Sequence, residues 1–120
     1  MKLKHDNYSA ELIGDNTVRL SGVFRLQGKE QYMEVLSLLE NAIESASGSL
    51  IIDMTELSFL NSSGVSSLSI FVIQAREAGH KNIKIIGSDK YSWQAKSLKN
   101  FQKLWKNIEV EVREHVADAG

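Results

Sequence analysis

The residues best suited to chemistry in this sequence form the polar run Asn61, Ser62 and Ser63, which Gly64 follows. Side-chain oxygens of these types accept hydrogen bonds from the unpaired backbone N–H groups at the start of a helix. A serine that acts as a catalytic nucleophile needs an activating base. The sequence shows no Ser-His-Asp order, no glycine-rich phosphate loop and no metal cluster. We therefore expect the run to begin a helix, and we expect no enzymatic activity, no metal and no cofactor.

Other polar residues are weaker candidates for a site. Asp53 and Glu56 could form a pair of carboxylates, but an acid that ends a parallel strand serves equally as a hydrogen-bond acceptor that fixes a loop. The histidines are His5, His80 and His115. Metal ligands are usually closely spaced, and these histidines are not close in sequence to one another or to carboxylates in such a pattern. We predict that Asp53 positions the loop that follows it.

The elements around the polar run place it at the end of a strand. Residues 50–52 are consecutively apolar, which is typical of a strand buried at the centre of a sheet, and Asp53 closes this strand. Apolar residues of the following loop, Phe59 among them, would hold that loop against the core. A helix over about 63–78 comes next, with Gly79 at its C-terminal cap. The run is therefore expected in a loop at the carboxyl end of a parallel strand, where α/β sheets expose their functional residues.

The rest of the chain alternates strands with helices. Period-two patterns predict strands at 8–13, 18–26 and 108–112, and a further strand is expected at 82–86. A helix of about 16 residues is expected between Gly28 and Gly48, and another near Trp93. Parallel strands joined by crossover helices follow from this order. We predict one small α/β domain over residues 1–120, ordered at about 7–113, with a mixed, mostly parallel sheet of about five strands and helices packed on it.

Composition limits the classes of partner. The 120 residues include no Cys, 42% are hydrophobic and the net charge is -1, whereas a general nucleic-acid binder has an excess of Lys and Arg. No segment has the length of a membrane span or the pattern of a signal peptide, and the lack of Cys fits a reducing compartment. We predict a cytoplasmic protein, a monomer or weak dimer, with no nucleic-acid partner and no membrane insertion.

Charge is divided unevenly along the chain. Residues 28–60 hold six acids against Lys29, and seven Lys stand against one Asp between Lys81 and Lys106. Such a split can orient a charged partner, although lysines spread over a strand, a helix and a loop are typical of a solvated face. Aromatic residues stand among these lysines at a helical spacing that is typical of a core: Tyr91, Trp93, Phe101 and Trp105.

The segment from Asp53 to Gly64 resembles the signature of the STAS domain, which sulfate transporters and anti-sigma-factor antagonists share. In the bacterial antagonists the segment reads Asp-Leu-Ser, a few residues, then Phe-Met-Asp-Ser-Ser-Gly. Here it reads Asp53-Met54-Thr55, and then Phe59-Leu60-Asn61-Ser62-Ser63-Gly64. The predicted order of elements is also that of the family, so the resemblance covers nearly the whole chain.

The resemblance implies a regulatory binding module controlled at Ser62, where the family's phosphorylated serine falls. The unphosphorylated antagonist binds a serine kinase or anti-sigma factor of nucleotide-binding fold, phosphorylation releases it, and a phosphatase partner is implied by analogy. Two residues depart from the pattern, since Asn61 replaces an Asp and Ser66 stands where a second Gly is common. The predicted partner-binding patch surrounds Ser62 and consists of Leu60, Asn61, Ser63, Gly64, Val65, Ser66 and Ser67.

The resemblance thus implies a non-enzymatic regulator in a bacterial partner-switching circuit that controls transcription. Two other functions stay open. A STAS subunit of a lipid-transport complex would bind a transporter ATPase without a phosphate switch. Asn61, which lacks the charge of Asp, favours that alternative slightly. A small-ligand-binding domain is the third possibility, and it would need a sizeable pocket.

Overall fold

The computed structural model describes residues 2–79 and 82–115, so Met1, His80, Lys81 and the tail after His115 lie outside the described residues. The described chain contains a six-stranded sheet and three helices. The strands are β1 (Lys2–Lys4), β2 (Tyr8–Ile13), β3 (Thr17–Phe24), β4 (Leu50–Leu60), β5 (Ile83–Ser88) and β6 (Ile108–Arg113). The helices are α1 (Gly28–Ser45), α2 (Ser62–Glu77) and α3 (Ser92–Gln102).

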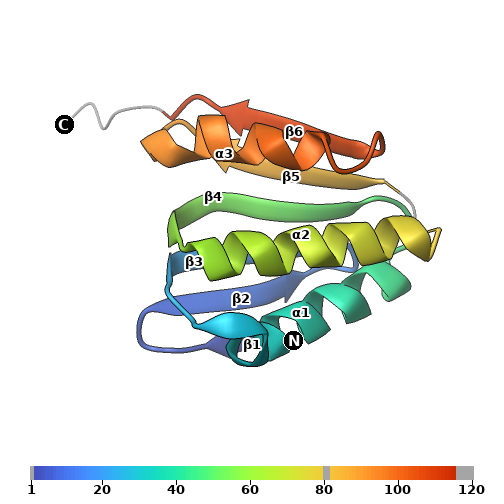
Figure 1. Ribbon diagram of the computed structural model, residues 1–120, viewed down its shortest axis with the longest axis horizontal. Coiled ribbons are helices and arrows are strands. Elements are labelled where there is room, and N and C mark those ends of the chain that lie inside the picture. The colour runs from blue at the N-terminus through green and yellow to red at the C-terminus, as the bar shows by residue number, and fades with distance from the viewer. Residues whose placement is uncertain (1, 80–81, 116–120) are drawn as a thin grey trace.

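The strands lie in the sheet in the order in which they occur in the chain. Strands β1 to β3 pair antiparallel, and β3 to β6 pair parallel. Each parallel connection passes through one helix and moves one strand further in the same direction. Because such crossovers are right-handed, all three helices lie on one face of the sheet, with α2 between α1 and α3 (Figure 1). The predicted mostly parallel α/β domain is confirmed.

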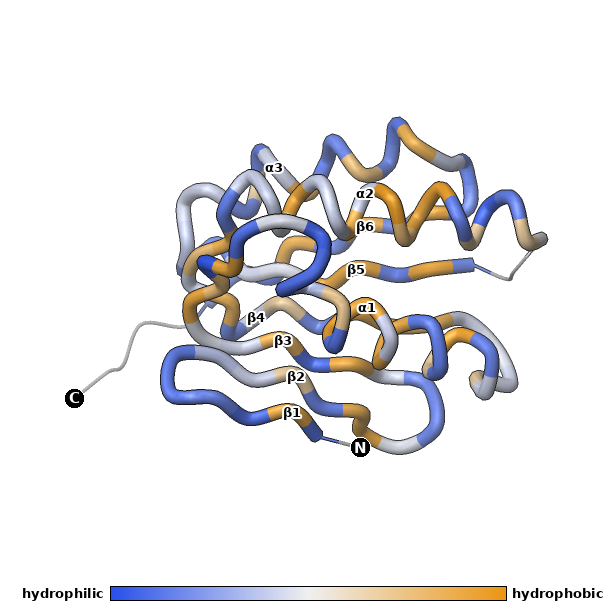
Figure 2. The backbone as a smooth tube through the Cα atoms, turned by 60° about the horizontal axis from the view of Figure 1, so that its bottom comes forward, coloured by the Kyte–Doolittle hydropathy of each residue, from blue (hydrophilic) through white to orange (hydrophobic). Residues whose placement is uncertain are grey.

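The two faces of the sheet differ in character. Alternate side chains point toward the helices and form the core, as Leu20 and Ile52 do on β3 and β4. Figure 2 shows this alternation as a change of colour from residue to residue along the strands. The helix-free face carries charged side chains that pair with one another: Arg19 with Asp53, and Lys84 with Glu109 and Glu111. Residues 50–52 are therefore covered by helices on one side only.

Strand β4 is longer than the sequence predicts. Its pairing with β5 ends at Asp53, opposite Ile86, but its pairing with β3 continues to Leu60, opposite Phe24. Two register shifts in the β3–β4 ladder accommodate this length, one of them beside Gly22. The prediction that the strand closes at Asp53 and becomes a loop is therefore wrong. The segment after Asp53 is extended chain that pairs along one side.

The ends of other elements also differ from the prediction. Strand β1 raises the strand number from about five to six, and its three residues are too few to show a period. Helix α1 has 18 residues rather than about 16 and ends at Ser45. Helix α2 begins at Ser62, one residue earlier than expected. None of the helices in the described part of the chain combines the length and the apolar character that crossing a membrane requires.

Candidate functional site

Ser62 is the first residue of α2 and stands two residues after the end of β4. This is the edge of the sheet where the parallel strands end, as the predicted position requires. The side chain of Ser62 is exposed, and it makes no hydrogen bond to another described residue. The free N–H groups of the first helical turn and the positive end of the helix dipole lie beside it. Its hydroxyl is therefore accessible, in surroundings that favour negative charge.

Asn61 fixes the start of α2 with both ends of its side-chain amide. Its Oδ1 atom accepts a hydrogen bond of 2.9 Å from the backbone N–H of Gly64 and one of 2.7 Å from the hydroxyl of Tyr32. Its Nδ2 atom donates a hydrogen bond of 2.7 Å to the carbonyl oxygen of Leu26. The predicted helix cap is confirmed, and Asn61 alone provides it. One side chain thus joins α2 to α1 and to the segment that leaves β3.

The same geometry accounts for an amide where the antagonists carry a carboxylate. Both hydrogen bonds that Asn61 accepts at Oδ1 would also suit an aspartate oxygen. The second oxygen of an aspartate would face the Leu26 carbonyl, and two acceptors repel each other. An amide, unlike a carboxylate, both donates and accepts at this position, so the local hydrogen bonding of this chain suits Asn61.

Tyr32 is a part of the site that the sequence does not reveal. Its apolar neighbours place it on the buried stripe of α1, and it is 2% exposed. Burial disfavours the phenolate and raises the pKa of Tyr32 to about 12. The hydroxyl is therefore protonated at every physiological pH and remains a donor to Asn61. The available signal is that a buried tyrosine hydroxyl needs a hydrogen-bond partner.

The predicted partner-binding patch is only partly accessible. Ser62 and Ser66 are exposed, and Asn61, Ser63 and Val65 are half-buried. The other three positions of the patch are buried and offer a partner little side-chain surface: Leu60, Gly64 and Ser67. They face the core because they lie on the inner side of α2 or, for Leu60, on the inner face of β4.

Gly64 is required where α2 passes over α1 and β4. A Cβ atom at this position would lie 2.3 Å from Cδ1 of Leu60 and 2.7 Å from the hydroxyl oxygen of Tyr32. Both distances are far below van der Waals contact. The role of Gly64 is therefore close packing of the helix start, which brings the Tyr32 hydroxyl within reach of Asn61.

Asp53 lies in the middle of β4 rather than at its end. One carboxylate oxygen accepts hydrogen bonds from the backbone N–H of Thr55 at 2.9 Å and from the Thr55 hydroxyl at 2.7 Å. The other accepts a bond of 3.3 Å from Nε of Arg19. Desolvation alone would raise the pKa of Asp53, but these hydrogen bonds outweigh it, so the pKa lies below its usual value. Asp53, in its carboxylate form, thus fixes the backbone at Thr55.

Phe59 does not hold the segment against the core as predicted. It is 39% exposed, and the guanidinium carbon of Arg25 lies 5.1 Å from the centre of its ring. The reason is the period of the extended strand, which turns Leu60 inward and Phe59 outward. A cation–π contact on the surface replaces the expected core contact.

Helix α3 performs the anchoring that the sequence assigns to Phe59. Gln94 is fully buried, and its Nε2 atom donates to the carbonyl oxygens of Met54 at 2.8 Å and Leu57 at 2.7 Å. The indole N–H of Trp93 donates to the carbonyl oxygen of Ser58 at 2.9 Å. These side chains satisfy carbonyl groups of β4 beyond the point where β5 stops pairing. A polar residue at an inward helix position is the sequence signal for this role.

A shallow recess of about 260 Å³ adjoins Ser62 between the first halves of α1 and α2. The backbone N–H of Gly28 donates to the Ser63 hydroxyl oxygen at 3.3 Å and links the two helix starts. Lys29 brings a positive charge to the recess. The residues that line it are Gly28, Lys29, Ser62, Ser63, Ser66, Ser67 and Ile70.

Comparison with known proteins places this geometry in a known fold. No family model and no curated protein matches the sequence. SiaC of Pseudomonas aeruginosa matches in structure with a TM-score of 0.68 at 14% identity, over 96% of this chain and 98% of SiaC. A chain in the crystal structure of the diguanylate cyclase SiaD in complex with its activator SiaC, from the same organism, matches with a TM-score of 0.69 at 12% identity, over 96% of this chain and 99% of that chain. The chain is therefore a single α/β domain with the STAS-like fold of SiaC.

Proposed function

We propose that this chain is a non-catalytic regulatory domain that binds a signalling protein through the surface around Ser62, and that a phosphate on Ser62 prevents the binding. The observation that carries the proposal is the contrast at the start of α2. Asn61 and Gly64 are fixed by hydrogen bonds and close packing, whereas the hydroxyl between them is exposed and unbonded. A rigid surface with an accessible hydroxyl at the start of a helix suits a binding switch.

The free domain should tolerate a phosphate on Ser62. A phosphoserine carries about -1.5 to -2 charges and three strong acceptor oxygens. At the first residue of α2 these oxygens meet free N–H groups and the positive end of the helix dipole. Lys29, across the adjoining recess, adds a positive charge. Phosphorylation therefore requires no change of fold.

The same phosphate is unfavourable when a partner covers it. A dianion must lose its water on binding, and without a compensating cation on the partner this costs several kcal/mol. A penalty of about 3 kcal/mol already weakens binding more than a hundredfold. The switch thus operates on the complex and leaves the domain itself intact.

Two classes of partner have support. The resemblance of residues 53–64 to the antagonists favours a serine kinase or anti-sigma factor that phosphorylates Ser62 or is released by its phosphorylation. The likeness in fold to a chain of the SiaD–SiaC complex favours a second class, a nucleotide cyclase that the domain activates. Both classes require an accessible protein-binding surface, and the first also requires phosphorylation of Ser62.

Phosphorylation is tested by incubating the chain with ATP and the kinase encoded by a neighbouring gene. Intact mass and peptide mapping should then show one phosphate, on Ser62, and none in Ser62→Ala. A phosphate at another residue, or no phosphate with an active kinase, would contradict the switch.

Binding is tested by titration calorimetry with a partner identified by affinity purification. Ser62→Ala should bind as the parent does, and Ser62→Asp should bind at least about a hundredfold more weakly. Ser92→Asp is the matched control, because Ser92 is also an exposed first residue of a helix, α3. Equal affinities of Ser62→Ala and Ser62→Asp would sink the proposal.

A further inference from the structure

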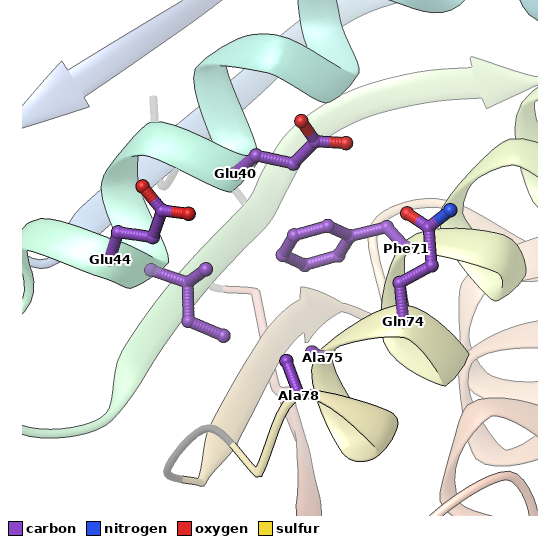
Figure 3. Close-up of a pocket in the computed structure, with 7 residues that line it drawn as sticks. Glu40, Glu44, Phe71, Gln74, Ala75 and Ala78 are labelled. Atoms are coloured by element: carbon purple, nitrogen blue, oxygen red, sulfur yellow. The ribbon is translucent and has the colours of Figure 1, made fainter.

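A second recess, of about 300 Å³, lies between α1 and α2 near their C-terminal ends. Figure 3 shows Glu40 and Glu44 on the α1 side of the opening and Phe71 and Gln74 on the α2 side. The recess beside Ser62 has walls from the same two helices. The residues of the second recess are Glu40, Ile43, Glu44, Phe71, Gln74, Ala75 and Ala78. We call the surface of α1 and α2 that holds both recesses the α1–α2 groove.

Two exposed apolar side chains lie at or near the recess beside Ser62. Ile70 is 37% exposed and lines the recess beside Ser62. Met33 is 55% exposed and stands one helical turn after Lys29, a residue of that recess, so it lies on the same side of α1. The remaining large exposed apolar residue among those described, Phe59, already has Arg25 over its ring. Met33 and Ile70 are therefore exposed apolar side chains without such a contact.

The far end of the groove favours a cation. Glu40 and Glu44 are four residues apart on α1, a spacing at which like charges repel. Neither carboxylate has an ion-pair partner within residues 2–79 and 82–115. They also stand near the C-terminal end of α1, where the dipole is negative and the last turn has no basic residue. A lysine or arginine from outside would offset both the repulsion between the carboxylates and their interaction with the negative end of the dipole.

We infer that the α1–α2 groove binds an amphipathic helix of the partner, whose apolar residues cover Met33 and Ile70 and whose lysine or arginine reaches Glu40 and Glu44. This rests on the proposed function and assigns a chemistry to the partner's segment. The 16 residues of α2 span about 24 Å, which is room for a helix of four to five turns with apolar residues at a spacing of three and four. Ser62 lines the other end of the groove, so its phosphate would meet this helix directly.

The test uses a synthetic helical peptide of about 18 residues, with leucines at a spacing of three and four and two lysines near one end. It is titrated into the isotope-labelled chain and followed by NMR. Saturable changes in chemical shift should centre on the resonances of Met33, Ile70 and Gln74. The variant Ile70→Asp should abolish binding, and its circular dichroism spectrum should be unchanged because the side chain is exposed.

Charge reversal in the groove provides the matched comparison. The double variant Glu40→Lys, Glu44→Lys should weaken peptide binding about tenfold or more. The double variant Glu30→Lys, Glu34→Lys changes the same charge at the same spacing on α1, outside the residues that line the groove, and should leave binding within about twofold. Equal losses in both double variants, shifts centred elsewhere, or no saturable binding would overturn the inference.

Two further readouts separate this inference from its alternatives. Sedimentation of the chain alone should give a monomer, and a dimer abolished by Glu40→Lys, Glu44→Lys would assign the groove to a second copy instead.

The peptide titration needs neither a kinase nor the cognate partner. Failure of Ser62 phosphorylation would therefore leave a positive titration standing, and a negative titration would leave the phosphate switch standing.

Discussion

The hydroxyl of Tyr32 in α1 donates a hydrogen bond of 2.7 Å to Oδ1 of Asn61, the residue that caps α2. The same oxygen accepts the backbone N–H of Gly64, and the amide nitrogen of Asn61 donates to Leu26. The position of Ser62 is therefore set by α1 and by the segment after β3 as well as by its own helix.

Replacing Asn61 by Asp should destabilise the domain. The change removes the donor to the Leu26 carbonyl and leaves two partly buried acceptors facing each other, at a cost of about 1–3 kcal/mol. The gain from a negative charge at a helix N-terminus is smaller, about 0.3–1 kcal/mol. Urea unfolding measures the difference, with Asn100→Asp, on the exposed side of α3, as control. A variant as stable as the parent would show that the amide donor is dispensable.

The stability of the domain should decline at alkaline pH because of Tyr32. Burial raises the pKa of Tyr32 in the folded chain from 10.0 to about 12. The neutral phenol of Tyr32 therefore makes its full contribution to the free energy of unfolding below pH 10. This contribution is lost as the pH rises through about 12. Tyr32→Phe should cost about 0.5–1.5 kcal/mol at pH 7 and flatten the decline. Unfolding free energies between pH 8 and pH 11.5 test this, with Tyr91→Phe as control.

Replacing Gln94 by Leu should be among the more damaging single changes. It leaves the carbonyls of Met54 and Leu57 and the N–H of Ser88 without their buried partner, and each such group costs about 1–3 kcal/mol. Chemical denaturation should show a loss of about 3 kcal/mol or more. The exposed Gln102, also on α3, provides the control Gln102→Leu. Equal stabilities of the two variants would contradict the anchoring role of Gln94.

The free domain should be slightly more stable with a charge at residue 62. Ser62→Asp places a carboxylate at the first residue of α2, where the dipole is worth about 0.3–1 kcal/mol at low ionic strength. The gain should fall in high salt because the site is exposed. Ser62→Asn, which adds no charge, is the matched control in thermal unfolding. Destabilisation by Asp alone would mean that the helix start does not tolerate a phosphate.

Much of the architecture can be predicted because it depends on local patterns. The alternation along β3, the spacing of apolar residues on α1 and the polar residues before α2 each report on a single element. The second half of β4 could not be predicted in this way. Its extended form depends on irregular pairing with β3 and on Gln94, which contacts it from 37 and 40 residues away.

The candidate site also combines features that local sequence patterns predict with features that depend on distant residues. The exposure of Ser62 and the cap by Asn61 follow from residue types next to each other in the chain. The bond from Tyr32 spans 29 residues, so no neighbouring pattern reveals it. The burial of Ser67, and the outward turn of Phe59, depend on how α2 and β4 are rotated against the core, which a list of residue types does not specify.

The agreement between strand order in the sheet and in the chain has a consequence for biosynthesis. Each strand pairs with the strand synthesised just before it. The entropic cost of closing the loop between them is therefore low, and pairing can follow the order of translation. Trp93 and Gln94 are the exception, since they reach back to β4. We expect the nascent chain to fix the end of β4, which leads to Ser62, only after α3 has left the ribosome, so that the surface around Ser62 is completed late.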